Sequence, residues 1–107
     1  MRDAIVVFVT TSSKKEAQKI ANALVKQKLA ACVQILPQME SIYVWDKKTC
    51  RDKEFLLIIK SQKKLFSQLE KAILKLHSYK VPQMVALPII QGHRPYLQWL
   101  KNSLHSK

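Results

Sequence analysis

The fold is decided by the hairpin-like sequence LAACVQILPQMESIYVW (residues 29–45), the polar residues 46–48, and FLLIIK (residues 55–60). Both apolar segments are rich in β-branched and aromatic residues, which favour strands, and the polar segment between them predicts a turn. The first segment is much longer than the average strand of about 5 to 6 residues. Pro37 interrupts it, and proline is confined to sheet edges and bulges because it has no backbone N–H to donate. The pattern predicts a long β-hairpin whose first arm is one kinked strand or two strands in line.

The segments on either side of this hairpin supply the other expected elements. Residues 5–9 are a compact β-prone run, which predicts a buried first strand. Ser13 and Glu16 have the spacing of a capping box, so a helix should begin there and end near Lys28. The later expected elements are an amphipathic helix over 65–77, a strand over 84–90 with a bulge or edge at Pro88, and a helix with Pro95 in its first turn and a frayed tail from Asn102.

This order is β-α-β-β-α-β with an added C-terminal helix, which is the ferredoxin-like arrangement. We therefore expect an α+β protein with an antiparallel sheet, in a single domain that spans residues 1–107. A sheet with one face in water should alternate apolar and polar residues, but residues 5–9, 55–59 and 84–87 do not alternate. Both faces must then be covered, and the short last helix is too small to cover the second one. The sequence therefore predicts self-association, with the long hairpin adding a strand to a neighbour's sheet edge.

The formal net charge of +12 and the pI near 10.0 raise nucleic acid as a partner, because a basic surface can neutralise phosphates. The lysines are spread along the chain, however, which is typical of solvated faces. No segment approaches the ~18 to 20 apolar residues of a membrane span, and residues 1–9 lack the features of a signal peptide. Cys32 and Cys50 lie in unlike contexts that do not imply a disulfide. We expect a cytoplasmic protein with reduced cysteines and no membrane association.

Two kinds of nucleotide recognition are disfavoured by the sequence. The single glycine excludes Walker and dinucleotide-binding loops, which need several glycines. RNA-recognition modules share the predicted element order, but their third strand carries a glycine- and aromatic-rich sequence. The matching segment here is RDKEFLLI (residues 51–58), with no glycine and one aromatic residue. We therefore do not expect nucleic acid to be a partner.

Cysteine and histidine are the residues with the most reactive chemistry in this chain. Pairing Cys32 or Cys50 with His77, His93 or His105 gives no diagnostic motif for nucleophilic catalysis. Thiol and imidazole also suit copper or zinc, but the CxxC and HxxxH spacings of structural zinc sites are absent. A metal site would have to join distant segments, such as those of Cys32 and His77, or be completed across a subunit boundary. The structural alternatives are a small buried Cys32, a helix-capping His77, and exposed His93 and His105.

Five blocks of the sequence resemble, in the same order, the signature blocks of the divalent-cation tolerance (CutA) family. They are LAACV (29–33), SIYVW (41–45), LLIIK (56–60), LHSYKVP (76–82) and YLQWL (96–100). The resemblance covers nearly the whole chain. It implies a ferredoxin-like subunit in a tight homotrimer with interlocking hairpins, an association with copper tolerance and divalent-metal binding, and no enzyme activity.

The same resemblance implies the metal ligands. Cys32 matches the cysteine of the family's Leu-Ala-Ala-Cys block, and His77 matches the histidine of its Leu-His-Pro-Tyr block. Three positions depart from the family pattern: Ser78 replaces a proline, Lys80 replaces a commonly acidic residue, and Gln83 replaces a glutamate. Losing a carboxylate and gaining a cation both weaken a divalent-cation site.

We therefore expect a non-enzymatic homotrimer linked to copper tolerance and the response to metal ions. It should need no obligatory cofactor, with copper or another divalent cation as its expected ligand. The alternative is a trimeric regulatory or scaffold protein that binds a small anionic ligand or a protein partner through its lysines. The side chains expected in clefts between subunits are Tyr43, Trp45, Lys60 and Tyr79.

Overall fold

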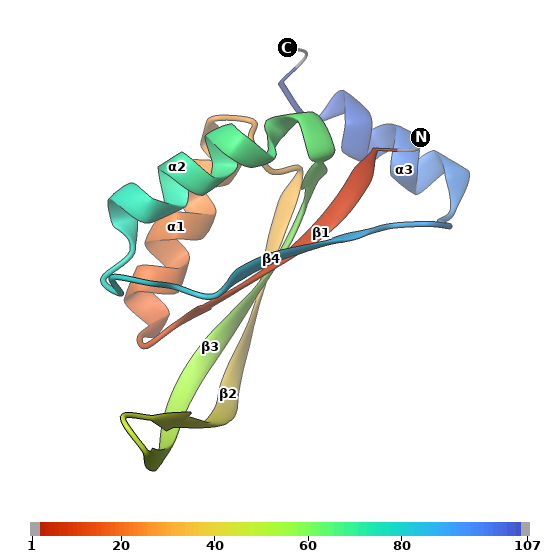
Figure 1. Ribbon diagram of the computed structural model, residues 1–107. Coiled ribbons are helices and arrows are strands. Elements are labelled where there is room, and N and C mark those ends of the chain that lie inside the picture. Colours follow the sequence, from red (N-terminus) through yellow and green to blue (C-terminus); the bar gives the residue numbers. More distant parts are fainter. Residues whose placement is uncertain (1–2, 106–107) are drawn as a thin grey trace.

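The computed structural model describes residues 3–105, which form a four-stranded antiparallel sheet and three helices (Figure 1). Helices α1 and α2 lie together on one side of the sheet. Helix α3 lies apart from them, at the end of the sheet far from the tip of the β2-β3 hairpin. The predicted α+β class and the β-α-β-β-α-β order with an added helix are confirmed. The elements are β1 (Ala4–Thr11), α1 (Lys14–Lys26), β2 (Cys32–Trp45), β3 (Lys48–Gln62), a 3₁₀ turn (Lys63–Leu65), α2 (Phe66–Leu76), β4 (Met84–Pro88) and α3 (Arg94–Asn102).

The predicted hairpin is formed by β2 and β3. Its turn contains Asp46 and Lys47, whose φ angles of 53° and 65° are both positive, as in the two-residue loops that match the twist of paired strands. A register shift between Leu36 and Met39 confirms the predicted kink at Pro37. The first arm is therefore one bulged strand.

The outer half of this hairpin projects beyond the rest of the sheet. The strand order is β2-β3-β1-β4, but β1 pairs with β3 only from Phe55 to Gln62. The remainder of β3 pairs with β2 alone and extends away from the helices (Figure 1). The radius of gyration is 14.4 Å, against about 13 Å for a compact domain of this length. A two-stranded ribbon of this kind is marginally stable by itself in water.

The ends of α1 follow from local sequence. The Ser13 hydroxyl accepts a hydrogen bond from the Glu16 backbone N–H at 3.1 Å, as the capping box predicts. The Glu16 carboxylate instead accepts bonds from the Ser78 N–H at 3.0 Å and the Ser78 hydroxyl at 3.1 Å. Because Ser78 follows α2, this contact ties the start of α1 to the end of α2. The helix ends at Lys26, and Lys28 then takes the left-handed conformation that closes many helices, with φ 59°.

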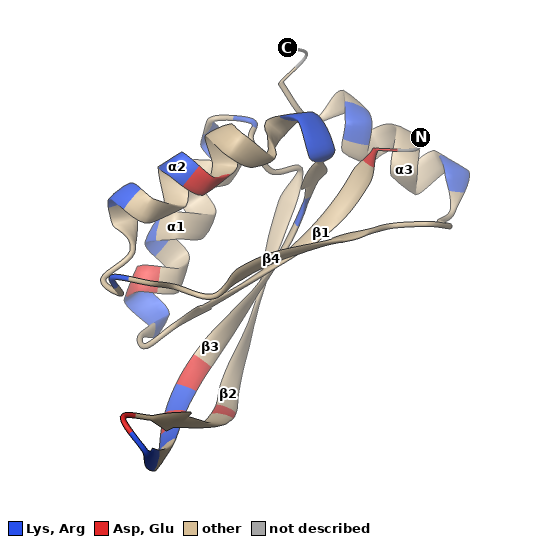
Figure 2. Ribbon diagram, viewed as in Figure 1, with Lys and Arg blue, Asp and Glu red and all other residues tan. Residues whose placement is uncertain are grey.

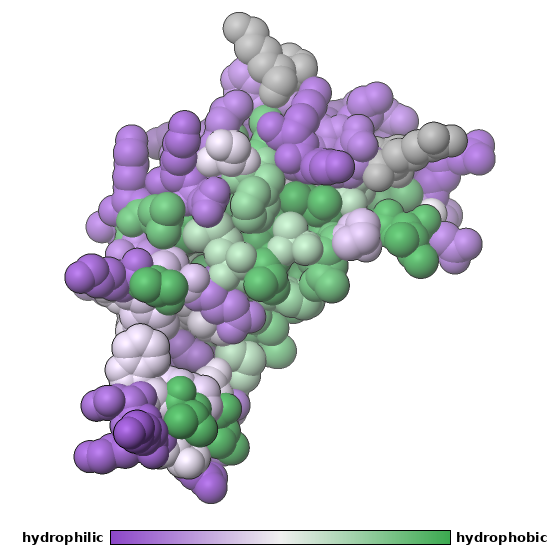
Figure 3. All heavy atoms as spheres, viewed as in Figure 1, coloured by the Kyte–Doolittle hydropathy of each residue, from purple (hydrophilic) through white to green (hydrophobic). Residues whose placement is uncertain are grey.

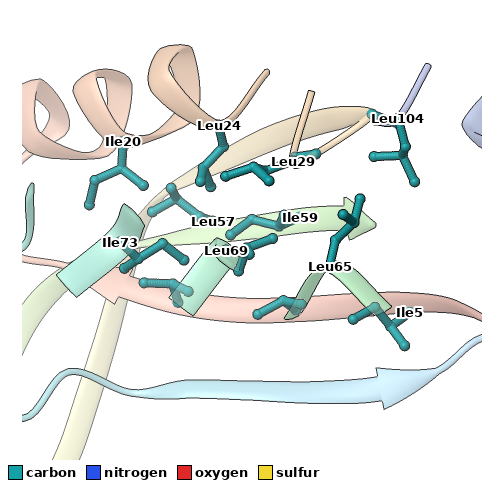
Figure 4. Packing of buried hydrophobic residues seen from close by; sticks show 14 of the residues in the cluster. Ile5, Ile20, Leu24, Leu29, Leu57, Ile59, Leu65, Leu69, Ile73 and Leu104 are labelled. Carbon is teal, nitrogen blue, oxygen red and sulfur yellow. The ribbon is translucent and has the colours of Figure 1, made fainter. Parts of the chain in front are cut away.

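The main core lies between the sheet and helices α1 and α2. Alternate residues of β1 and β3 point towards the helices, and the apolar stripes of both helices point back towards the sheet (Figure 4). Leu104, in the C-terminal tail, also packs against this cluster. The fully buried Leu, Ile and Val side chains are Val7, Val9, Ile20, Leu24, Leu57, Ile59, Leu65, Leu69, Ile73 and Leu100.

The opposite face of the sheet is also apolar, as the lack of alternation predicts. Residues directly opposite one another in antiparallel strands share a face, so the register places Phe8, Ile58 and Val85 together on the face away from α1 and α2. Figure 3 shows hydrophobic residues gathered around β4 and the adjacent sheet, hydrophilic residues over α2, and residues of both kinds side by side at the hairpin tip. We call this surface the second face; its apolar members are Val6, Phe8, Leu36, Leu56, Ile58, Val85 and Leu87.

Three expected elements have different ends in the structure. The helix expected over 65–77 begins with a 3₁₀ turn and ends at Leu76. The tail is not frayed from Asn102, because Leu104 is buried and the His105 N–H donates to the Lys28 carbonyl at 2.8 Å. The strand expected over 84–90 ends at Pro88, and it lies at the edge of the sheet as predicted. Within residues 3–105, none of the helices has both the length and the apolar character needed to cross a membrane.

Candidate functional site

The residues that the sequence predicts for a site lie in three separate regions. The first surrounds Cys32 at the start of β2, and the second surrounds His77 after α2. The third is the hairpin tip with Tyr43 and Trp45. We call these regions, in this order, the thiol cluster, the histidine cluster and the hairpin tip.

The thiol cluster lies on the second face. Cys32 is half-buried, with its Sγ 3.7 Å from the Tyr96 hydroxyl of α3 and 4.0 Å from the Lys60 Nζ. Lys60 also donates to the Gln34 Oε1 at 2.7 Å. Burial, followed by the hydrogen bond with Cys32, raises the pKa of the Tyr96 hydroxyl. Cys32 is thus a free thiol beside a cation and a phenol, and not the fully buried small hydrophobe of the structural alternative.

The histidine cluster uses both nitrogens of the His77 ring. His77 is 9% exposed, and its Nε2 lies 2.7 Å from the Thr10 carbonyl oxygen. Because a carbonyl can only accept, the ring proton is on Nε2, and Nδ1 accepts the Tyr79 N–H at 3.0 Å. The Glu16 carboxylate is 3.7 Å from Nδ1, but an Nδ1 that accepts an N–H bond carries no proton to share with it. His77 therefore joins the end of α2 to β1, as a structural histidine does.

A buried carboxylate extends the histidine cluster towards the hairpin. Glu54 is 8% exposed, and its two oxygens accept hydrogen bonds from the Ser41 hydroxyl at 2.6 Å and the Tyr79 hydroxyl at 2.7 Å. Burial and, after it, the bond to Glu54 raise the pKa of Tyr79 to about 12. The Tyr79 and His77 rings are also in contact, with centroids 4.8 Å apart. Tyr79 thereby connects the loop after α2 to the base of the projecting ribbon.

Replacing Glu54 with glutamine is expected to lower the pKa of Tyr79 from about 12 towards ~10, because the bond to a carboxylate favours the neutral phenol. The shift should be partial, since burial is its largest cause. A raised pKa in the folded state means that the unfolded chain loses its proton first. The stability due to this phenol is therefore fully present below pH ~10 and is lost as the pH rises through about 12. Titration of the tyrosinate absorbance checks this prediction.

Asp52→Asn is the matched control, because the bond between Tyr43 and Asp52 is the main cause that raises the pKa of Tyr43 to about 12. That variant should lower the pKa of Tyr43 and change Tyr79 little. A Glu54→Gln protein whose tyrosine titration is identical to that of the original protein would contradict the assignment.

The hairpin tip is exposed in the single subunit. The Tyr43 hydroxyl donates to the Asp52 carboxylate across the hairpin. Trp45 is 70% exposed and pairs with Lys48 in the register. Within one subunit, these aromatic residues lie at the opposite end of β3 from Lys60, so they do not form a joint cleft with it.

The thiol and histidine clusters are also apart. Cys32 is opposite Lys60, and Thr10, which holds His77, is opposite Leu56. These two β3 positions are four residues apart, which corresponds to about 13 Å along the strand. Among residues 3–105, no three His, Cys, Asp or Glu side chains are grouped so that they can hold a metal ion. One subunit therefore does not present a complete metal site.

Two residues of these clusters were not among the candidates from sequence. Tyr96 contacts Cys32 across 64 positions of sequence, and Glu54 contacts Tyr79 across 25. Glu54 carried one usable signal, since it is an acidic residue that directly precedes the apolar sequence of residues 55–59. Tyr96 lies in the YLQWL block that resembles the family, but its ring also fits the pattern of an ordinary amphipathic helix, so nothing pointed to its contact with Cys32.

The fold and its clusters define a class of protein: a small α+β protein with an overlong β2-β3 hairpin, an apolar second face and a free thiol on that face. The family model described as CutA1 divalent ion tolerance protein matches residues 5–103. The chain therefore belongs to the CutA1 divalent ion tolerance family.

Members of the family resemble this chain in sequence and in structure. The Divalent-cation tolerance protein CutA of Thermus thermophilus is 45% identical over 98 residues, which are 92% of this chain and 95% of the relative. The chloroplastic Protein CutA of Arabidopsis thaliana is 47% identical over 94% of this chain, but the chain spans only 55% of that relative's length. The crystal structure of CutA1 from Oryza sativa superimposes with a TM-score of 0.96 at 42% identity, covering 99% of this chain and 97% of that one.

Proposed function

We propose that three copies of this chain form a closed homotrimer that acts in divalent-cation tolerance. The observation that carries the assembly is the apolar second face, which α1 and α2 do not cover. Val85 and Leu87 are exposed there, and the whole of β4 carries no charged residue. Contiguous exposed apolar surface of this kind marks an interface in soluble proteins.

The projecting ribbon supports the same assembly. The sheet ends at β4 on one side, and an edge strand offers unpaired N–H and C=O groups to another chain. A hairpin from one subunit that adds to the β4 edge of the next makes a head-to-tail contact, and such contacts form a ring when the rotation closes. In this proposal the predicted cleft residues Tyr43 and Trp45 meet a neighbouring subunit, which brings them near groups that one chain keeps apart.

We propose that any divalent cation or copper ion is held between subunits, with the Cys32 thiol as the ligand from this chain. Among residues 3–105 of one copy, the side chains do not fit a metal, since the thiol cluster provides no second cysteine or histidine. His77 would have to give up its bond to Thr10 or to Tyr79 before it could coordinate. The family pattern has acidic residues at the positions of Lys80 and Gln83. Because hard divalent cations prefer carboxylate oxygens, these two changes weaken binding of a hard cation more than binding of a soft one.

Cys32→Ser is expected to weaken copper binding by about tenfold or more, because it replaces the soft sulfur ligand with a hydroxyl. The measurement is a competition titration of the reduced protein with Cu(I) and a chromogenic chelator. Cys50→Ser is the matched control: Cys50 is also a free, half-buried thiol, but it lies on the ribbon near the Lys48 carbonyl. Equal copper affinity in the original protein and both variants would remove Cys32 from the proposed site.

The proposal includes a non-enzymatic role and a cytoplasmic location. The two free cysteines support a reducing compartment. The names of relatives mention chloroplast and periplasm, so fractionation of the cell that makes this protein is the measurement that tests the location.

A second candidate function is the capture of an anionic ligand or protein partner, favoured by the charge of the helical side. Lys and Arg residues are distributed over α1, α2 and α3 with few acidic residues among them (Figure 2). Because such attraction is electrostatic, binding should fall steeply as salt rises and should be unchanged by a metal chelator.

A further inference from the structure

Two open hollows lie on the helical side of the molecule and meet at His105. The larger, of about 520 Å³, lies between α1 and α2, and the smaller, of about 270 Å³, lies where the start of α2 meets the end of α3. Their side chains come from a single subunit. The larger hollow is lined by Ala23, Gln27, Leu29, Gln68, Lys71, Ala72, Lys75, Leu76 and His105, and the smaller by Gln62, Lys64, Lys101, Asn102, Leu104 and His105.

The lining of both hollows has one sign of charge. Lys71 and Lys75 line the larger hollow and Lys64 and Lys101 the smaller one, and no aspartate or glutamate lines either. The remaining lining is the His105 imidazole, amide side chains that can hydrogen-bond a peptide backbone, and apolar surface from Ala, Leu and the aliphatic stems of the lysines. A continuous tract with cationic edges and an apolar floor is complementary to a chain segment with acidic and apolar residues.

We propose that this tract docks an acidic amphipathic peptide segment of a partner protein. The apolar floor favours a peptide, whose leucine-like side chains would bury surface there in the helix-in-groove manner. Nucleic acid is disfavoured, because neither hollow is lined by Phe, Tyr or Trp for base stacking or by an arginine for bidentate phosphate contacts. The inference rests on the second candidate function and names its partner class. It does not depend on the trimer at Lys71 and Lys75, because these residues lie on α2, on the opposite side of the sheet from the second face.

Lys71→Glu with Lys75→Glu tests the tract. The probe is a fluorescein-labelled helical peptide with leucine on one face and glutamate on the other, and binding is followed by fluorescence anisotropy at low ionic strength. The double variant should bind at least about tenfold more weakly, because two attractive charges become repulsive. Lys14→Glu with Lys15→Glu is the matched control: it makes the same charge change on exposed residues of α1 that line neither hollow, so its affinity should stay within about twofold.

The outcomes distinguish binding in this tract from attraction of the peptide to the basic surface as a whole. Selective loss in the Lys71 and Lys75 variant, with an unchanged circular dichroism spectrum, supports the proposal. Equal weakening in both double variants overturns the tract but leaves the second candidate function intact. Tighter binding of an oligonucleotide or of anionic phosphatidylserine vesicles than of the peptide also overturns the proposal, as does the absence of peptide binding.

Discussion

Replacing His77 with alanine is expected to lower the free energy of unfolding by about 2 to 4 kcal/mol. The imidazole is almost fully buried, so its removal leaves a cavity beside the Tyr79 ring. It also leaves the Thr10 carbonyl and the Tyr79 N–H without their hydrogen-bond partner. A buried polar group without a partner adds its desolvation cost to that of the cavity. Urea unfolding followed by circular dichroism measures the change as a shift in the transition midpoint.

His93→Ala is the control for the loss of an imidazole. His93 precedes α3, is exposed, and makes no side-chain capping bond, so its replacement should change the stability by no more than about 0.5 kcal/mol. If both variants are equally stable, His77 is not a structural residue and its nitrogens are available to a metal. The comparison matters for copper titrations as well, because a destabilised His77→Ala protein would lose metal binding without His77 being a ligand.

The sequence predicted the parts of the fold that depend on local chemistry. Pro37 predicted the bulge because a missing N–H disrupts a strand wherever it occurs. Ser13 predicted the start of α1 because its hydroxyl acts on a backbone group three positions away. The absence of alternation in residues 55–59 predicted a sheet with two apolar faces, since that pattern is a property of each strand alone.

The candidate site was less predictable because its contacts join distant positions. The capping box placed the Glu16 carboxylate on its own helix, but Ser78 competes for it across 62 positions of sequence. The block containing His77 resembled a metal-binding block, yet the neighbours that occupy both ring nitrogens come from β1 and from the loop after α2. Which partner such a side chain bonds depends on tertiary packing, and the composition and spacing of the sequence do not identify that partner.

Replacing Leu87 with glutamate is expected to convert the proposed trimer into single subunits of 12.4 kDa. Leu87 lies next to the last residue of the uncharged edge strand β4 and shares the second face with Val6. In the trimer its side chain would be buried against a neighbour, so the substitution would bury an unpaired carboxylate at every contact between subunits. The cost of that burial is several kcal/mol for each carboxylate. Size-exclusion chromatography with light scattering measures the mass directly, and circular dichroism shows whether the separated subunits remain folded.

Leu74→Glu is matched to this change in chemistry and in exposure. Leu74 is 48% exposed in the single subunit and Leu87 is 44% exposed. The two substitutions therefore remove apolar side chains of similar exposure. Leu74, however, lies on the outer surface of α2, where the proposed assembly leaves it in water. The Leu74→Glu protein should therefore keep the mass of the trimer, and only the Leu87→Glu protein should lose it. An original protein that already has the mass of one subunit, or a Leu87→Glu protein that keeps the oligomeric mass, would show that the second face is not the interface.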